Sequence, residues 1–192
     1  MDHLLISVYV LGLLIFLALV FDFMNGFHDA ANAIATVVST GVLKPQTAVA
    51  MSALFNFVAI FTVGVHVATT VGKGTVDPHI VDHYVVFGAL VGAIVWNVIT
   101  WYYGIPSSSS HALIGGLVGA AVAKSGTGAL VGGGLLKTVT WIILTPLLGF
   151  LLGSIVMLAV SWIFVKTPPR KVDTWFRRLQ LVSAAAYSLG HG

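Results

Sequence analysis

Acidic and amide side chains recur at helical spacing near the start of the chain. Asp22, Asn25, Asp29 and Asn32 follow one another at intervals of three and four residues, so on a helix they share one face. Charged side chains are expensive within an apolar segment and are usually functional there. Carboxylate and amide oxygens on one face suit Na⁺ or a proton. We interpret these four residues as candidate cation ligands; the alternative is a polar contact between helices.

A histidine lies inside the same cluster. His28 directly precedes Asp29, and an imidazole titrates near neutral pH. His28 is therefore a candidate for proton coupling, with a packed and hydrogen-bonded histidine as the alternative.

A second polar motif is a run of four serines. Pro106 precedes the run and His111 follows it. Proline favours the first turn of a helix and serine is a favoured N-cap, so the motif predicts a half-helix starting near residues 106–111. The first N–H groups of such a helix lack partners, and its dipole favours an anion. The candidate phosphate ligands are Ser107, Ser108, Ser109 and Ser110.

This serine motif has alternative interpretations. It could be an ordinary capped loop or a flexible serine linker, although its place between two apolar segments disfavours a solvated linker. His111 is a second candidate for proton coupling. A hydrolase built on a serine, His111 and Asp29 is disfavoured, because the serines are equivalent and no Gly-x-Ser-x-Gly elbow is present. We therefore predict no enzyme activity and no catalytic residue.

The composition defines the setting of both motifs. The chain is 58% hydrophobic and 8% charged, whereas soluble domains carry about 25% charged residues. The apolar runs are long enough to span a bilayer, which takes roughly 20 residues of helix. The absence of cysteine excludes disulfides and thiolate metal sites. The sequence predicts an all-α, polytopic membrane protein with no cofactor and no metal site other than a coupling cation.

The apolar segments predict the elements that carry the motifs. Residues 4–43 are too long for one ordinary span, so we expect a broken helix near residues 22–32. Helices are expected over 47–70 and 84–103. The segment 112–123 is too short to span, which favours a re-entrant half-helix. A long stretch over 135–165 holds one tilted or kinked span.

The positive charge is concentrated in one segment. Five Lys or Arg residues and a single Asp lie within residues 166–178, which predicts a cytoplasmic loop. The charge reflects topology rather than nucleic-acid binding. Residues 1–165 precede this segment, and residues 179–192 would be the start of the next helix. We expect a multi-pass protein of the cell membrane, the inner membrane if the source is bacterial.

Anion transport follows from the two motifs together. No Lys or Arg lies deep in an apolar segment, so an anion must be recognised by hydroxyls, N–H groups and bound cations. The Asp carboxylates would repel phosphate unless protonated or cation-bound. Cation-coupled symport, with H⁺ or Na⁺, is the resulting hypothesis. An anion channel or passive pore is the alternative, because half-helices also build selectivity filters.

Three segments resemble the PiT family of inorganic phosphate transporters. The segment NGFHDAANAIAT, residues 25–36, is similar to the N-terminal signature of that family. The segment WNVITWYYGIPSSSSHALIG, residues 96–115, is similar to its serine-rich re-entrant segment. Residues 183–192, SAAAYSLGHG, are similar to the approach to its second signature.

The resemblance carries several implications. The family has two inverted repeats, so residues 1–165 would form an N-terminal transmembrane repeat. A chain that stops before the second acidic signature would be an N-terminal half whose partner is a missing C-terminal half. Asp29 and Asn32 would join cation or phosphate binding, with Asp22 and Asn25 nearby, and the serine run would hold phosphate. The substrate would be inorganic phosphate, free or as metal–phosphate. The chain would sit in a lipid bilayer, alone or as a homo-oligomer, with no nucleic-acid partner.

Overall fold

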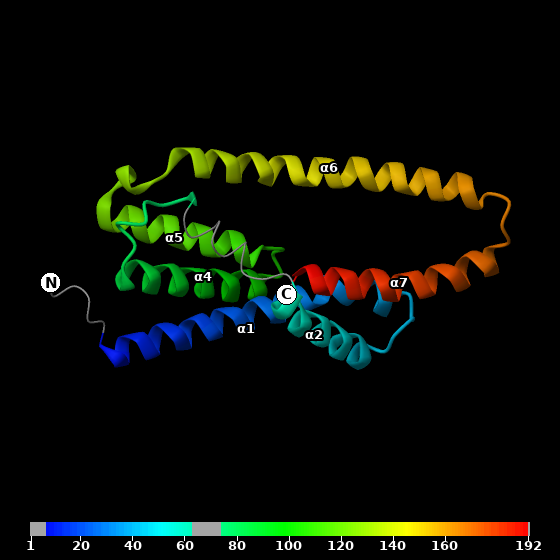
Figure 1. The fold of residues 1–192 in the computed structure, drawn as a ribbon, viewed down its shortest axis with the longest axis horizontal. Helices are drawn as coiled ribbons and strands as arrows, with labels where there is room; N and C mark the ends of the chain where they lie inside the picture. The colour runs from blue at the N-terminus through cyan, green and yellow to red at the C-terminus, as the bar shows by residue number, and fades with distance from the viewer. Residues whose placement is uncertain (1–6, 63–73, 192) are drawn as a thin grey trace. The chain divides into compact units, whose positions relative to one another are not determined.

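Residues 7–62 and 74–191 are described in the computed structural model of this chain (Figure 1). They are predominantly helical and form two compact units. Unit 1 comprises Met1–Asp29 and His66–Leu135, and unit 2 comprises Ala30–Val65 and Leu136–Gly192. The predicted all-α architecture is confirmed.

Within the described residues, three helices are long and apolar enough to cross a membrane. They are α1 (Val8–Ser39), α4 (His83–Tyr103) and α6 (Gly132–Phe164). Apolar helices of this length need a lipid environment. The chain is therefore a multi-pass membrane protein.

Helix α1 is continuous, so the predicted break near residues 22–32 was wrong. That prediction relied on the mismatch between residues 4–43, about 60 Å long as one helix, and a hydrocarbon core of about 30 Å. Length alone does not break a helix, because its backbone groups satisfy one another. A proline would remove one of those bonds, and α1 contains none. A long helix can also tilt.

Helices α4 and α5 (Ser109–Ser125) form an antiparallel hairpin in unit 1 (Figure 1). Gly104 ends α4 with φ 64°, in the left-handed region that favours glycine. Small residues let the helices approach closely. A Cβ built on Gly116 would lie 2.5 Å from the Ala89 carbonyl oxygen, and one on Gly88 would lie 3.1 Å from the Ala120 Cβ.

A backbone bridge and an ion pair close the other end of this hairpin. Val76 and Leu130 form an antiparallel bridge beside the 3₁₀ turn η1 (Thr127–Ala129). Asp82 caps α4 by accepting a hydrogen bond from the Val85 N–H, 3.1 Å away. Its carboxylate also forms an ion pair with Lys124 of α5 at 2.8 Å.

In unit 2, helices α2 (Pro45–Thr62) and α7 (Pro169–His191) pack together. Ala48 of α2 and Ala184 of α7 are buried with Val37 of α1. The helix expected over 47–70 is confirmed as far as Thr62, and residues 63–70 lie outside the described residues.

Most of the basic segment 166–178 is helical, so the predicted loop was wrong. Helix α7 begins at Pro169, a residue favoured at the first helical position. Asp173 and Arg177 pair one turn apart at 2.9 Å, which supports the helix. High charge indicated exposure correctly, but an exposed segment can be a solvated helix. Its cytoplasmic side and the assignment of residues 1–165 to one repeat remain predictions.

Candidate functional site

The start of α5 places the serine run at the mouth of the α4–α5 hairpin. Ser108 is the N-cap, and its hydroxyl accepts a hydrogen bond from the His111 N–H at 3.4 Å. Ser109 is the first helical residue, so the predicted half-helix start is confirmed. Its re-entrant course in a membrane remains a prediction. Ser109 and Ser110 hold helix positions whose N–H groups have no carbonyl four residues back within the helix.

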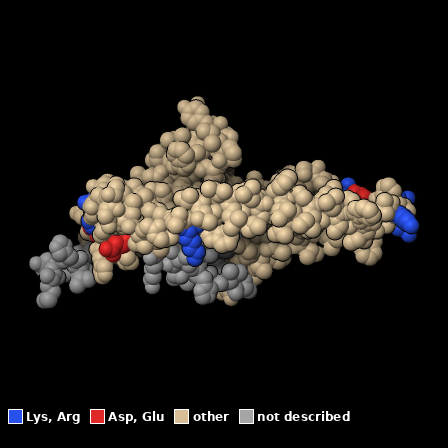
Figure 2. Space-filling model, turned by 90° about the horizontal axis from the view of Figure 1, so that it is seen from above, with Lys and Arg blue, Asp and Glu red and all other residues tan. Residues whose placement is uncertain are grey.

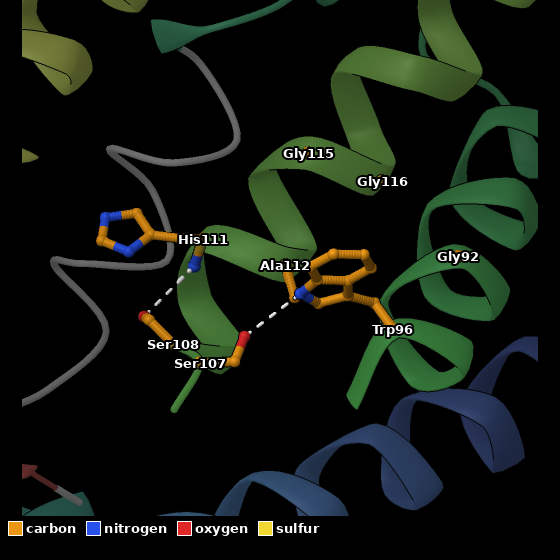
Figure 3. A pocket seen from close by; sticks show the side chains of 8 residues that line it. All are labelled: Gly92, Trp96, Ser107, Ser108, His111, Ala112, Gly115 and Gly116. Carbon is orange, nitrogen blue, oxygen red and sulfur yellow. Dashed lines mark hydrogen bonds between the residues drawn. The ribbon is translucent and has the colours of Figure 1, made fainter. Parts of the chain in front are cut away.

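A tryptophan on α4 reaches across the hairpin to the serine run. Trp96 Nε1 donates a hydrogen bond to the Ser107 hydroxyl oxygen at 3.1 Å. In Figure 3 these two side chains point toward one another, whereas the His111 ring points away from Trp96. An indole N–H can only donate, so Ser107 accepts this bond. Its own hydroxyl hydrogen is left for another acceptor.

These residues line a half-open cavity of about 490 Å³ between α4 and α5 (Figure 3). This volume falls in the range of small-molecule sites, about 300–1,000 Å³. Glycines leave the wall without side chains and so provide space. The lining residues are Gly92, Trp96, Ser107, Ser108, His111, Ala112, Gly115 and Gly116.

The structure divides the four predicted serine ligands into two groups. Ser107 and Ser108 line the cavity. Ser109 is only 3% exposed, and Ser110 is exposed but outside the cavity lining. Ser109 and Ser110 therefore offer their backbone N–H groups to the helix terminus rather than hydroxyls to the cavity.

The cavity is suited to an anion without containing a fixed cation. No Lys or Arg is among its lining residues. The positive end of the α5 dipole lies there, together with the N–H groups of Ser109 and Ser110, which have no carbonyl partner within the helix. Such a site attracts negative charge by oriented dipoles and hydrogen-bond donors.

The acidic and amide cluster lies on α1, as one face of an unbroken helix. Asp22 and Asn32 are exposed, and Asn25 and Asp29 are half-buried. None of the four lines the serine cavity. In unit 1, the Phe27 ring lies 6.0 Å from the Trp101 ring, which links α1 to α4.

One ring nitrogen of His28 is hydrogen-bonded, and the other is buried without a partner among the described residues. Its Nδ1 donates to the Met24 carbonyl oxygen at 2.8 Å, because a carbonyl can only accept. Its Nε2 is buried without a hydrogen-bond partner among the described residues. In the neutral ring Nε2 therefore presents a lone pair.

The comparison with known families identifies the chain. Residues 25–192, which include the serine run and, except for Asp22, the acidic and amide cluster, match the phosphate transporter family. The chain belongs to this family. It spans about half the length of most of the curated relatives that it matches.

Several relatives show how this member compares with other proteins of the phosphate transporter family. It is 59% identical over 179 residues to a "Probable low-affinity inorganic phosphate transporter" of Rhizobium meliloti (strain 1021), covering 93% of this chain and 54% of that protein. A protein of Bacillus subtilis (strain 168) with the same name is 49% identical over 182 residues, covering 94% and 54%. A "Low-affinity inorganic phosphate transporter PitB" of Escherichia coli (strain K12) is 35% identical, covering 94% and 43%.

One solved structure shares the fold of this phosphate transporter family chain. It is named "The sodium-dependent phosphate transporter" and superposes with a TM-score of 0.76 at 21% identity. The match covers 94% of this chain and 55% of the other. At this level of identity the likeness shows the fold alone.

Two features of the site were missed from the sequence. Trp96 stands inside the motif over residues 96–115, but its hydrogen bond to Ser107 depends on the register of the hairpin. The glycines that shape the cavity, Gly92, Gly115 and Gly116, look like ordinary packing glycines in the sequence. These glycines lie on two helices that face one another, one before and one after a proline–serine turn. That arrangement is the signal that could have revealed the cavity.

Proposed function

We propose that this chain binds inorganic phosphate in the serine cavity and a coupling cation, H⁺ or Na⁺, on α1. The whole protein would use both sites for cation-coupled phosphate symport across the cell membrane. One observation carries the phosphate assignment. The cavity at the start of α5 combines serine hydroxyls with a helix N-terminus and no cationic side chain.

The phosphate would be held by donors alone. Because Ser107 accepts from Trp96, its own hydrogen can point to a phosphate oxygen. Ser108 adds a second hydroxyl, and the N–H groups of Ser109 and Ser110 complete the helix terminus. Hydrogen bonds to a charged group contribute about 1.5–3 kcal/mol each, so a few of them hold an anion without a cationic side chain.

The cation would be held by oxygens on α1. Asp29 and Asn32, with Asp22 and Asn25 on the same face, supply the carboxylate and amide oxygens that suit Na⁺. His28, through its unpaired Nε2, and His111 are the candidates for a proton route. An ionised Asp near phosphate is repulsive, so cation or proton binding must accompany the anion. This repulsion is the physical basis of coupling.

The comparisons support this proposal at a coarser level. The family and the names of the curated relatives point to inorganic phosphate. The name of the structural relative refers to sodium dependence in that protein. We carry phosphate, and Na⁺ as one of two coupling ions, to this chain as proposals.

Phosphate binding can be tested on the purified chain in detergent with radiolabelled phosphate. Ser107→Ala removes a donor to the anion, so the Kd should rise about ten-fold or more. Ser161→Ala is the matched control, because its exposed hydroxyl donates to the Met157 carbonyl on α6. Equal Kd values for wild type and Ser107→Ala would refute the phosphate site.

Coupling is tested by varying the cation. Phosphate affinity of the wild type should rise with Na⁺, or with falling pH, and Asp29→Asn should remove that dependence. Saturable binding that ignores both ions, together with flux that persists without an ion gradient, would favour a channel. Adding a chelator distinguishes free phosphate from metal–phosphate, because only binding of the latter is lost.

A further inference from the structure

A group of exposed cations lies where α6 turns into α7. Lys166, Arg170, Lys171, Arg177 and Arg178 are all exposed. In Figure 2, Lys and Arg side chains gather at this end of unit 2, whereas most of the α6 surface carries no charge. Of these five cations, only Arg177 has a carboxylate partner in the described part of the chain, Asp173 at 2.9 Å. The charges of the other four are not offset by a carboxylate within the described residues.

The first half of α7 is amphipathic. Arg170 and Arg177, and likewise Lys171 and Arg178, are seven residues apart, so each pair shares a side of the helix. Trp175, Leu179 and Val182 follow at spacings of four and three, on a side directly next to the one that carries Lys171 and Arg178. They are 66%, 53% and 66% exposed. The same turns of α7 therefore carry cations and, next to them, apolar side chains that no other described residue covers.

Helix α6 indicates the depth at which this segment lies. Between Lys137 and Lys166 the chain has no charged residue, and this interval is about 40 Å long as a helix, enough for the roughly 30 Å hydrocarbon core. Lys166 therefore marks one membrane boundary. The Phe164 and Phe176 rings meet at 5.5 Å, so the second turn of α7 stays beside the end of α6. The cations of α7 thus lie near the level of the lipid headgroups.

We propose that the α6–α7 turn and the first half of α7, residues 166–179, bind the headgroups of anionic phospholipids. The cations pair with lipid phosphates, while Trp175 and Leu179 enter the boundary between headgroups and acyl chains. A protein partner fits these observations less well, because burying four unpaired cations is costly. The headgroup layer supplies counter-charge and water without such burial.

The test measures lipid selectivity of the whole 192-residue chain reconstituted in vesicles of phosphatidylcholine with about one-quarter phosphatidylglycerol. Electron spin resonance of spin-labelled lipids gives the association constant of phosphatidylglycerol relative to phosphatidylcholine. We expect wild type to prefer phosphatidylglycerol, and the preference to decline at high salt, where the Debye length shrinks from about 10 Å at 0.1 M to about 3 Å at 1 M.

Variants locate the preference on the chain. Each cation near an anionic surface is worth on the order of a five-fold change in binding. Arg178→Gln should therefore lower the preference, and adding Arg170→Gln and Lys171→Gln should bring it near one. Lys137→Gln removes one exposed lysine at the other end of α6, outside the group of cations on residues 166–178. It is the matched control and should lower the preference less than Arg178→Gln does.

Two results would overturn the proposal. One is that the wild-type chain binds the two lipids with equal association constants. This measurement does not depend on the folding of any variant. The other is a preference lost equally in Arg178→Gln and Lys137→Gln at unchanged helix content by circular dichroism, which would indicate general surface charge. Arg178→Lys preserves the charge and should preserve the preference.

Discussion

Trp96 Nε1 donates to the Ser107 hydroxyl across the α4–α5 hairpin at 3.1 Å, and this bond determines what Ser107 can offer. With its oxygen engaged as an acceptor, Ser107 presents a donor to the cavity. Trp96→Phe removes the N–H and keeps an aromatic ring. We expect the Kd for phosphate to rise about two- to ten-fold, the range of one neutral hydrogen bond.

The mechanism behind that prediction is checked by a double-mutant cycle. In the Ser107→Ala background, Trp96→Phe should have little further effect on phosphate affinity, because the bond it removes is already absent. Trp101→Phe is the control, since Trp101 packs against Phe27 and does not line the cavity. Fully additive effects of Trp96→Phe and Ser107→Ala would show that the two side chains act separately.

Two adjacent glycines of α5 should respond oppositely to alanine. A Cβ on Gly116 would lie 2.5 Å from the Ala89 carbonyl oxygen, so Gly116→Ala must push the helices apart and should destabilise the chain by about 1–3 kcal/mol. A Cβ on Gly115 meets nothing within 4 Å. Gly115→Ala should therefore keep or raise the thermal midpoint in detergent while its methyl group weakens phosphate binding by occupying the cavity. A lower midpoint for Gly115→Ala than for Gly116→Ala would contradict the packing.

The ionised carboxylate of Asp82 should make the stability of the chain depend on pH in the acid range. Its hydrogen bond and ion pair with Lys124, helped by the Val85 N–H, hold the pKa of its carboxyl below the ordinary value of 3.8, while burial opposes this. A lowered folded pKa means that the stabilisation is complete above 3.8 and is lost as pH falls through the folded value. Both side chains are about one-third exposed or more, so roughly 0.2–1 kcal/mol is at stake.

The measurement for Asp82 compares unfolding midpoints against pH for wild type and Asp82→Asn. Asparagine still caps α4 but cannot form the ion pair. The difference between the two midpoints should be constant near neutral pH. It should shrink toward zero below about pH 4, near the ordinary pKa of an Asp carboxyl. In a Lys124→Met background it should be small at every pH. A difference that persists unchanged in strong acid would show that the ion pair is not its source.

A buried hydroxyl pair joins α2 and α7 in unit 2. Ser188 Oγ donates to Ser52 Oγ at 3.1 Å, and both residues are at most 2% exposed. Ser52→Ala or Ser188→Ala alone leaves one hydroxyl buried without its partner, which should reduce stability by about 1–3 kcal/mol. The double variant should lose less than the two single losses combined. Chemical unfolding of the four proteins in detergent measures this, and strict additivity would exclude the coupling.

Local features could be predicted from residue order. The membrane class followed from apolar runs of spanning length, because transfer into lipid depends on the residues of one segment. The start of α5 at Ser109 followed from Pro106 and the serine cap, since capping involves only neighbouring residues. The shared face of Asp22, Asn25, Asp29 and Asn32 followed from helical periodicity, and the unbroken α1 satisfies it.

The tertiary structure decided which of these residues meet. The hairpin register placed Trp96 against Ser107, brought Ser108 but not Ser109 into the cavity, and set Gly116 against Ala89. It also showed α1 to be continuous, where a length argument had predicted a break. The physical reason is the range of the forces involved. Caps, periodicity and hydropathy act over a few residues of one segment, whereas a cavity exists only after two helices have fixed their distance and relative shift by packing.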